Sequence, residues 1–244
     1  MTILALLIVA VSAIYATAGQ AGGTGFLAVL ALTGFPGDEM RITALALTVV
    51  AAGYATWRLQ YAKVIDWALL RLLAVASLPA AFVGGLIVLQ GRVYSGLTGC
   101  LLLVAAISMI FRASLGCGKS PSLNRISALL AGASTGIVSG LTGLGGGVFL
   151  LPLLILLGWA SPKQAARISP PFILANSAAA LAAALLAGQR VAPAGIGFLA
   201  GAALAGSAIG TAIGLRWMSE AMTRYVIAAV LLTAAGQLLF RSMV

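Results

Sequence analysis

The sequence predicts an all-α fold: a polytopic bundle of membrane helices built as two homologous halves. Three observations lead to this prediction, namely long apolar runs, a pattern that recurs after half the chain, and a glycine-rich break at the matching place in each half. Of the 244 residues, 62% are hydrophobic and 7% are charged, whereas a soluble domain carries about a quarter charged residues. No stretch alternates apolar and polar residues as a membrane β-barrel would, so the spans are expected to be helices.

Composition excludes several classes of protein. The net charge of +10 comes from Lys and Arg residues scattered singly between apolar runs, without the basic stripe that binds nucleic acid. The chain has no His, and its cysteines are Cys100 and Cys117, which excludes a His-based metal site, a Ser-His-Asp triad and a Cys-His pair. We therefore expect no enzyme, no metal, no cofactor and no nucleic-acid partner.

The scarcity of carboxylates narrows the function further. All four acidic residues fall in predicted loops: Asp38, Glu39, Asp66 and Glu220. No carboxylate or imidazole is expected in the middle of a span, where it would bind a cation or relay protons. A cation channel or metal exporter is therefore disfavoured, and coupling to a proton gradient is not visible.

The second half of the chain repeats the first with a shift of 124 residues. The matching positions are Gly19, Gly22 and Gly23 with Gly143, Gly146 and Gly147, then Gly34-Phe35 with Gly158-Trp159, and, two inserted residues later, Arg41-Ile42-Thr43 with Arg167-Ile168-Ser169. Transporters are often built from such repeats, with the substrate site between them. We divide the chain into a first membrane repeat, 1–112, a cytoplasmic linker, 113–124, and a second membrane repeat, 125–244. The N-terminal segment has a counterpart at 125–139, which argues against a cleaved signal peptide.

Five apolar segments recur in the same order in each half. They span residues 2–18, 26–34, 42–57, 67–90 and 93–111, and then 126–140, 148–158, 168–187, 194–215 and 224–240. The second segment of each half is too short to cross a bilayer, which needs about 20 residues. We therefore expect about eight spanning helices and two short helices, each of which follows a Gly-rich break.

The distribution of Lys and Arg favours an inverted relation between the halves. If each short helix returns to the side from which its predecessor came, ten of these residues gather on one side and four on the other. If it crosses instead, the two sides carry eight and six. The positive-inside rule favours the first arrangement, with the linker in the cytoplasm and both termini outside. The two breaks then enter from opposite faces.

The Gly-rich breaks are the candidate substrate site. Each Gly in a helix interior costs roughly 1 kcal/mol relative to Ala, and non-helical backbone survives at membrane depth only where protein buries it or water lines it. The short helices would point their N-termini, with free N–H groups and partial positive charge, at a site that suits anions. The candidate residues here are Gly19, Gln20, Gly22, Gly23, Thr24, Thr142, Gly143, Gly145, Gly146 and Gly147.

Further candidates follow the short helices: Arg41, Thr43, Arg167, Ser169 and Asn176. An Arg inside a membrane is costly, and its planar fork suits oxyanions such as sulfite, sulfonate or carboxylate. The alternative is that both arginines are interfacial anchors. Asn176 either faces the site or bonds a neighbouring helix.

Two stripes of small residues have a structural interpretation. Gly recurs every fourth residue at 132, 136 and 140, and again at 206, 210 and 214. Such a spacing is typical of helices that pack closely in membranes. We expect these glycines to serve packing, not ligand binding.

The stretch from Gly140 to Ser169 resembles the signature of the TauE/SafE family, proposed exporters of sulfite and organosulfur anions in bacterial inner membranes. The matching residues are Gly145, Gly146, Gly147, Pro152, Gly158, Ala166 and Ser169, and the first half resembles a degenerate copy through Gly19, Gly22, Gly23, Gly34 and Thr43. Two features depart from the pattern: Ala28 stands where Pro152 would repeat, and Pro170-Pro171 follows Ser169.

The resemblance implies a multi-pass inner-membrane transporter of small anions, of the sulfite or organosulfonate type. Another carboxylate or inorganic anion is the first alternative, and a non-enzymatic membrane subunit of a partner complex is the second. The expected partners are the anionic substrate and the lipid bilayer. The sequence leaves open whether the protein forms a homo-oligomer.

Overall fold

The structure is a computed structural model and describes residues 1–35, 37–87, 124–188 and 195–243, with a few isolated positions between 96 and 107. All regular elements in this part of the chain are helices. They are α1 (Thr2–Thr17), α2 (Gly23–Leu32), α3 (Gly37–Tyr61), α4 (Trp67–Leu86), α6 (Arg125–Thr142), α7 (Gly147–Leu156), α8 (Pro162–Leu186), α9 (Ile196–Trp217) and α10 (Glu220–Met243). The all-α prediction is therefore confirmed. The predicted linker, 113–124, and most of the predicted segment 93–111 lie outside the described residues.

Four of the described helices are long and apolar enough to cross a bilayer. The spans run over Glu39–Tyr61, Trp67–Leu86, Pro162–Leu186 and Ile196–Trp217. α2 and α7 have 10 residues each, which agrees with the two short helices expected after the breaks. The total of eight spans stays a prediction, because α1 has only 16 residues and a full crossing needs about 20.

The third helix of each half begins earlier than its apolar segment. α3 begins at Gly37 and not near 42, and α8 begins at Pro162 and not near 168. A capping box explains α8, because the Ser161 side chain accepts a hydrogen bond from the Gln164 N–H and the Gln164 side chain bonds back to Ser161. The first turns are polar, so the apolar pattern missed them.

One further detail of the sequence prediction is wrong. Asp38 and Glu39 lie in the first turn of α3 and Glu220 is the first residue of α10, so these acids are helical and not in loops. They still lie at helix ends, away from the middle of a span. Pro170 and Pro171 lie inside α8 and do not disturb its start. Asp66 does lie outside a helix and caps α4.

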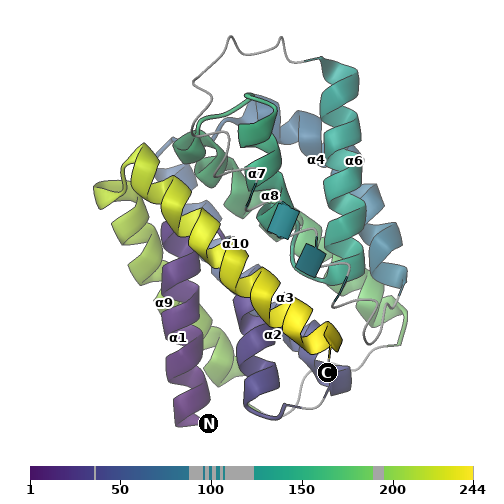
Figure 1. The fold of residues 1–244 in the computed structure, drawn as a ribbon, viewed down its shortest axis with the longest axis vertical. Coiled ribbons are helices and arrows are strands. Elements are labelled where there is room, and N and C mark those ends of the chain that lie inside the picture. Colours follow the sequence, from purple (N-terminus) through teal and green to yellow (C-terminus); the bar gives the residue numbers. More distant parts are fainter. Residues whose placement is uncertain are drawn as a thin grey trace.

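The helices pack crosswise between the halves. α1, the first helix of its half, lies along α9, and α6 lies along α4 (Figure 1). α3 and α8 lie between these two pairs and contact each other. Hydrogen bonds join the layers: the Ser12 hydroxyl donates to the Ala203 carbonyl at 2.7 Å, and Ser207 donates to the Ala51 carbonyl at 2.8 Å.

The two glycine stripes form the crosswise contacts. On α6, Gly132, Gly136 and Gly140 lie against the backbone of Leu73, Ser77 and Ala81 of α4, and on α9, Gly206, Gly210 and Gly214 lie against the backbone of Val9, Ala13 and Thr17 of α1. Any β-carbon on these glycines would meet the facing backbone. The packing interpretation of both stripes is therefore confirmed.

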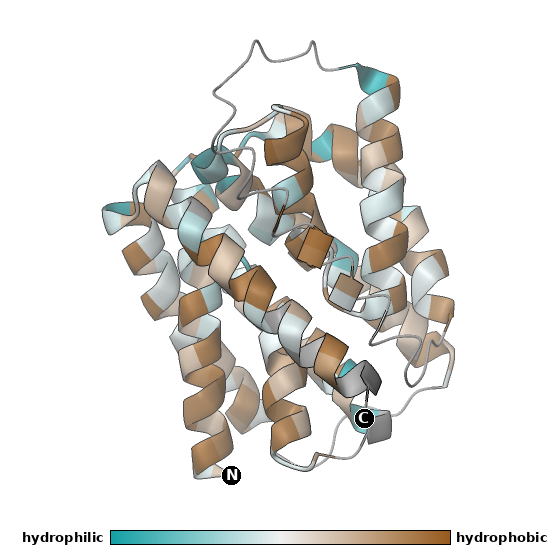
Figure 2. Cartoon of the chain, in the orientation of Figure 1, coloured by the Kyte–Doolittle hydropathy of each residue, from teal (hydrophilic) through white to brown (hydrophobic). Residues whose placement is uncertain are grey.

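Large apolar side chains face outward on the same helices. Ile3 is 75% exposed, Val75 is 68% exposed and Leu130 is 66% exposed. Figure 2 shows hydrophobic residues on the outer faces of helices throughout the bundle, with hydrophilic residues at the end where α6 starts. This pattern suits a protein whose outer surface contacts lipid hydrocarbon.

We expect a single methyl group to separate α9 from α1. A β-carbon on Gly210 would meet the Ala13 carbonyl and lie 2.7 Å from the Ala16 β-carbon, and such overpacking costs about 1–3 kcal/mol. Gly210→Ala should therefore lower the free energy of unfolding in detergent, measured by circular dichroism. Gly201→Ala is the matched control on the same helix, since nothing lies within 4 Å of the added methyl. Equal stability of the two variants would contradict the packing model.

Candidate functional site

The two helix breaks share left-handed glycines at two matching positions, and Gly145 adds a third in the second break. Gly19 and Gly143 have φ of 71° and 69°, and Gly22 and Gly146 have φ of 84° and 73°. L-residues with a side chain rarely adopt this left-handed region, so the conformation explains why glycine stands at these positions. Gly22 and Gly146 are the N-caps of α2 and α7, and neither helix has a side-chain cap.

The two breaks touch each other. A β-carbon on Gly23 would lie 3.0 Å from the carbonyl oxygen of Leu144, in the second break, and 3.3 Å from the hydroxyl oxygen of Thr48. Thr48 also adjoins the second break, since its methyl group lies 3.4 Å from where a β-carbon of Gly145 would be. Segments 121 residues apart therefore meet beside α3. The sequence analysis did not identify Thr48, because the only feature that marks it is a hydroxyl group within an apolar run.

Buried polar atoms without partners occur in the first break and at matching positions of α3 and α8. Gln20 is 1% exposed, and neither its amide oxygen nor its amide nitrogen has a hydrogen-bond partner among the described residues. Thr43 and Ser169, at matching positions of α3 and α8, are both 0% exposed with unpartnered hydroxyls. Buried polar groups in folded proteins bond to protein, water or a ligand. These groups are therefore available to bind a ligand.

Two more buried hydroxyls lie at the second break and were not among the predicted site residues. Ser177 of α8 adjoins Gly145, and Ser139 of α6 adjoins Gly146. Both hydroxyl oxygens lack a hydrogen-bond partner among the described residues. A single serine in an apolar helix does not indicate a binding site by itself. The sequence therefore did not identify Ser139 and Ser177, and only the structure places them at the second break.

Three other candidates have internal hydrogen bonds. The Thr24 hydroxyl pairs with the Tyr15 hydroxyl at 2.8 Å, and the Thr142 hydroxyl donates to the Val138 carbonyl at 2.6 Å. Asn176 donates to the Phe172 carbonyl at 2.9 Å and accepts from Ser77 of α4 at 2.6 Å. For Asn176 this geometry favours the second alternative, a bond to a neighbouring helix.

Each break contacts the third helix of the other half, and the second break also contacts the third helix of its own half. Gly19 lies against the backbone of Ala166 in α8, and a β-carbon there would overlap that residue. At the second break, the Arg41 side chain from α3 lies over Gly143 and donates to the Gly140 carbonyl at 2.7 Å. Gly147, the first residue of α7, lies against the Ile173 side chain of α8.

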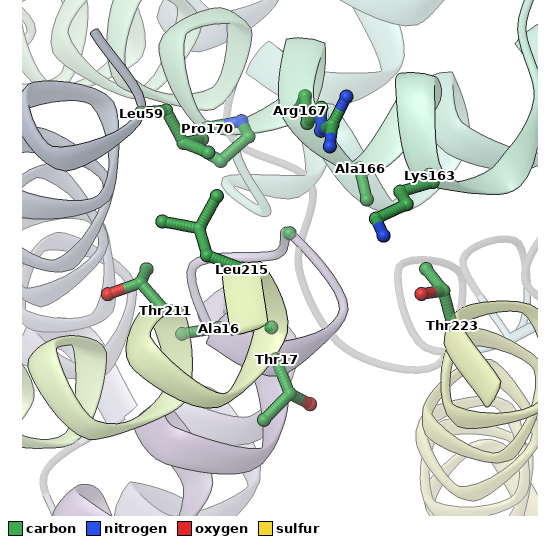
Figure 3. Close-up of a pocket in the computed structure, with 12 residues that line it drawn as sticks. Ala16, Thr17, Leu59, Lys163, Ala166, Arg167, Pro170, Thr211, Leu215 and Thr223 are labelled. Atoms are coloured by element: carbon green, nitrogen blue, oxygen red, sulfur yellow. The ribbon is translucent and has the colours of Figure 1, made fainter. Parts of the chain in front are cut away.

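Arg167 borders two hollows. The smaller one, about 30 Å³, lies beside Gly19 and is also lined by Lys163, Thr17 and Thr211. Figure 3 shows Lys163, Ala166 and Arg167 on one side of this hollow, with Ala16 and Thr17 of α1 on another. The larger one, about 170 Å³, lies between the α3–α4 and α7–α8 connections. Arg41 borders neither hollow.

Comparisons with known proteins agree with this architecture. The family model described as sulfite exporter TauE/SafE matches residues 4–238. A relative from Sinorhizobium fredii, described as probable membrane transporter protein y4hK, is 34% identical over 243 residues, which cover 97% of each chain. No solved structure matches the chain. The chain therefore belongs to the sulfite exporter TauE/SafE family of membrane transporters.

Proposed function

We propose that this protein moves small anions, of the sulfite or organosulfonate class, across the inner membrane through a site between the two helix breaks. The observation that carries the proposal is the contact of Gly23 with the Leu144 carbonyl, which joins the two breaks. The first break also holds Gln20, whose amide is buried without a partner among the described residues. Non-helical backbone at the centre of a membrane bundle is typical of transporter sites. The protein acts without catalysing a reaction.

The chemistry of the breaks favours an anion. α2 and α7 begin at the breaks without side-chain caps, so their first N–H groups and the positive ends of their dipoles face the site. No Asp or Glu side chain is among the described residues that contact the break glycines. Glycine brings these N–H groups close to a ligand, because no side chain intervenes.

The buried hydroxyls suit an oxyanion. Thr43, Ser139, Ser169 and Ser177 each keep an unpartnered hydroxyl that can donate to a sulfite or sulfonate oxygen. A site that combines backbone N–H groups with hydroxyls binds charge without burying a cation, which is costly in a membrane. The family description and the membrane-transporter relative support transport over the role of a partner-complex subunit.

We also propose that the halves are inverted copies, with eight spans and the linker in the cytoplasm. α1 rises from the N-terminus at the bottom of Figure 1, whereas α6 descends from the top. α2 lies in the lower part of the same view and α7 in the upper part. These opposite directions support the proposal that the two breaks enter the bundle from opposite faces of the membrane.

The transport proposal predicts saturable sulfite flux into liposomes that contain the purified protein. Gly23→Ala should lower that flux at least about tenfold, because the methyl group would fill the contact between the breaks without any strain in φ. Gly53→Ala is the control, since its methyl would have one neighbour at 3.9 Å. Sulfoacetate, formate and chloride should be compared in the same assay. Absence of flux for every anion would overturn the proposal.

Gln20→Leu separates a binding role from a structural one. Removing a buried, unpartnered amide should leave the thermal midpoint unchanged or raised, while sulfite flux falls about tenfold. Asn176→Leu provides the contrast, because the Asn176 amide forms hydrogen bonds with Ser77 and Phe172. This substitution should lower the thermal midpoint. A stability loss in Gln20→Leu as large as that in Asn176→Leu would contradict the binding role.

Cysteine labelling tests the inverted topology. In a Cys100→Ser, Cys117→Ser background, single cysteines at Lys63 and Lys119 should both react with a membrane-impermeant maleimide from the cytoplasmic side. A cysteine at Thr2 should react from the other side. Labelling of positions 63 and 119 from opposite sides would reject the model.

A further inference from the structure

The two matching arginines differ in their surroundings, and we infer that Arg167 binds the anion at the entrance to the first break, whereas Arg41 holds the second break in place. This inference rests on the proposed function and deepens it, because it gives the anion a binding site outside the breaks. It also predicts that two residues at equivalent places in the repeat are not interchangeable.

Arg41 is committed to the backbone of the second break. Its Nη2 atom donates to the Gly140 carbonyl at 2.7 Å, in the last turn of α6, and lies 3.5 Å from the Gly85 carbonyl of α4. Positive charge at the C-terminal end of a helix is stabilised by the helix dipole. The Arg41 side chain also covers Gly143, since a β-carbon there would lie 3.1 Å from its Cγ. Arg41 therefore links α3, α4 and α6 at the point where α6 ends.

Arg167 does not bond to backbone carbonyls as Arg41 does. Its guanidinium makes no hydrogen bond and no ion pair with the other residues that the structure describes, and the side chain is half-buried. It lines both the larger hollow and the smaller one beside Gly19. The planar fork of an Arg donates in pairs to an oxyanion. The free donors of Arg167 thus face a space that a ligand can enter.

The larger hollow has the size for a small oxyanion. Its volume is about 170 Å³, and a single water needs about 10–15 Å³ on this measure. One carboxylate, Asp66, lines it together with Gln164 and Trp159. The Asp66 carboxylate accepts from the N–H groups of Ala68 and Leu69 at 3.0 and 3.1 Å, which directs its charge to the N-terminus of α4.

The smaller hollow lies beside the first break. It is lined by Gly19, and its cations are Lys163 and Arg167, which lie one turn apart on α8. No Asp or Glu is among its lining residues. Its volume of about 30 Å³ is too small for an anion with its hydration shell, so passage requires the anion to exchange water for protein donors. Arg167 is the residue positioned to provide them.

Trp159 lines the larger hollow and provides a readout there that does not depend on transport. The other three tryptophans, Trp57, Trp67 and Trp217, are exposed and can be replaced by Phe in the full-length protein. Quenching of the remaining Trp159 fluorescence by iodide, an anion, is then compared with quenching by neutral acrylamide. Sulfite is titrated as a competitor of iodide.

Arg167→Gln should lower the iodide quenching constant about threefold, leave the acrylamide constant unchanged and abolish protection by sulfite. The matched control is Arg216→Gln, an exposed Arg in the last turn of α9 that borders neither hollow; it should match the parent protein. Arg41→Gln should lower the thermal midpoint by about 4 °C or more, a loss not expected for Arg167→Gln.

Equal iodide quenching in the parent protein and Arg167→Gln, or an equal loss in Arg216→Gln, would overturn the inference. An unchanged thermal midpoint in Arg41→Gln would overturn the assignment of Arg41. Transport is judged separately in liposomes. Sulfite flux without Arg167-dependent quenching rejects the entrance site alone, whereas Arg167-dependent quenching without flux of any anion supports the entrance site and rejects transport.

Discussion

The structure depends on enclosing two stretches of non-helical backbone inside a bundle that faces lipid. An unpaired N–H or C=O group exposed to hydrocarbon costs several kcal/mol, so each break needs protein around it. The first break lies against Ala166 of α8, and the second is bound by Arg41 of α3. The second break also lies against Ile173 and Ser177 of its own half, so both halves take part in enclosing the breaks. The contact between Gly23 and Leu144 places both breaks in one common interior.

Close approach of helix backbones makes this enclosure possible. Helices in lipid gain little from the hydrophobic effect and associate through van der Waals packing, so small residues decide which pairs form. The two crosswise pairs reach the same geometry from different sequences. The glycine stripe belongs to α6, the first helix of its half, in one pair, and to α9, the fourth helix of its half, in the other. A first and a fourth helix therefore pack closely in both pairs, but the glycines that allow this lie on the first helix in one pair and on the fourth helix in the other.

Features encoded locally were predictable from sequence. Composition and spacing predicted the apolar runs, the short helices α2 and α7 and the glycine breaks. The glycine stripes predicted close helix packing. Contacts between distant segments were not predictable. Nothing in the sequence links Arg41 to the carbonyl of Gly140, 99 residues away, or places Thr48 between the two breaks. The sequence prediction also missed the polar first turns of α3 and α8. A run of apolar residues indicates which part of a helix is buried, but it does not show where the helix begins.

The crosswise packing has a consequence for the order in which the chain can be assembled during synthesis. α4 and α6 are separated by about forty residues, so this pair can form soon after α6 leaves the ribosome. α1 and its partner α9 are separated by about 180 residues, so α1 is made long before α9. Until then, the face of α1 that contacts Gly206, Gly210 and Gly214 lies against lipid or the insertion machinery. α1 therefore waits for its partner much longer than α4 does.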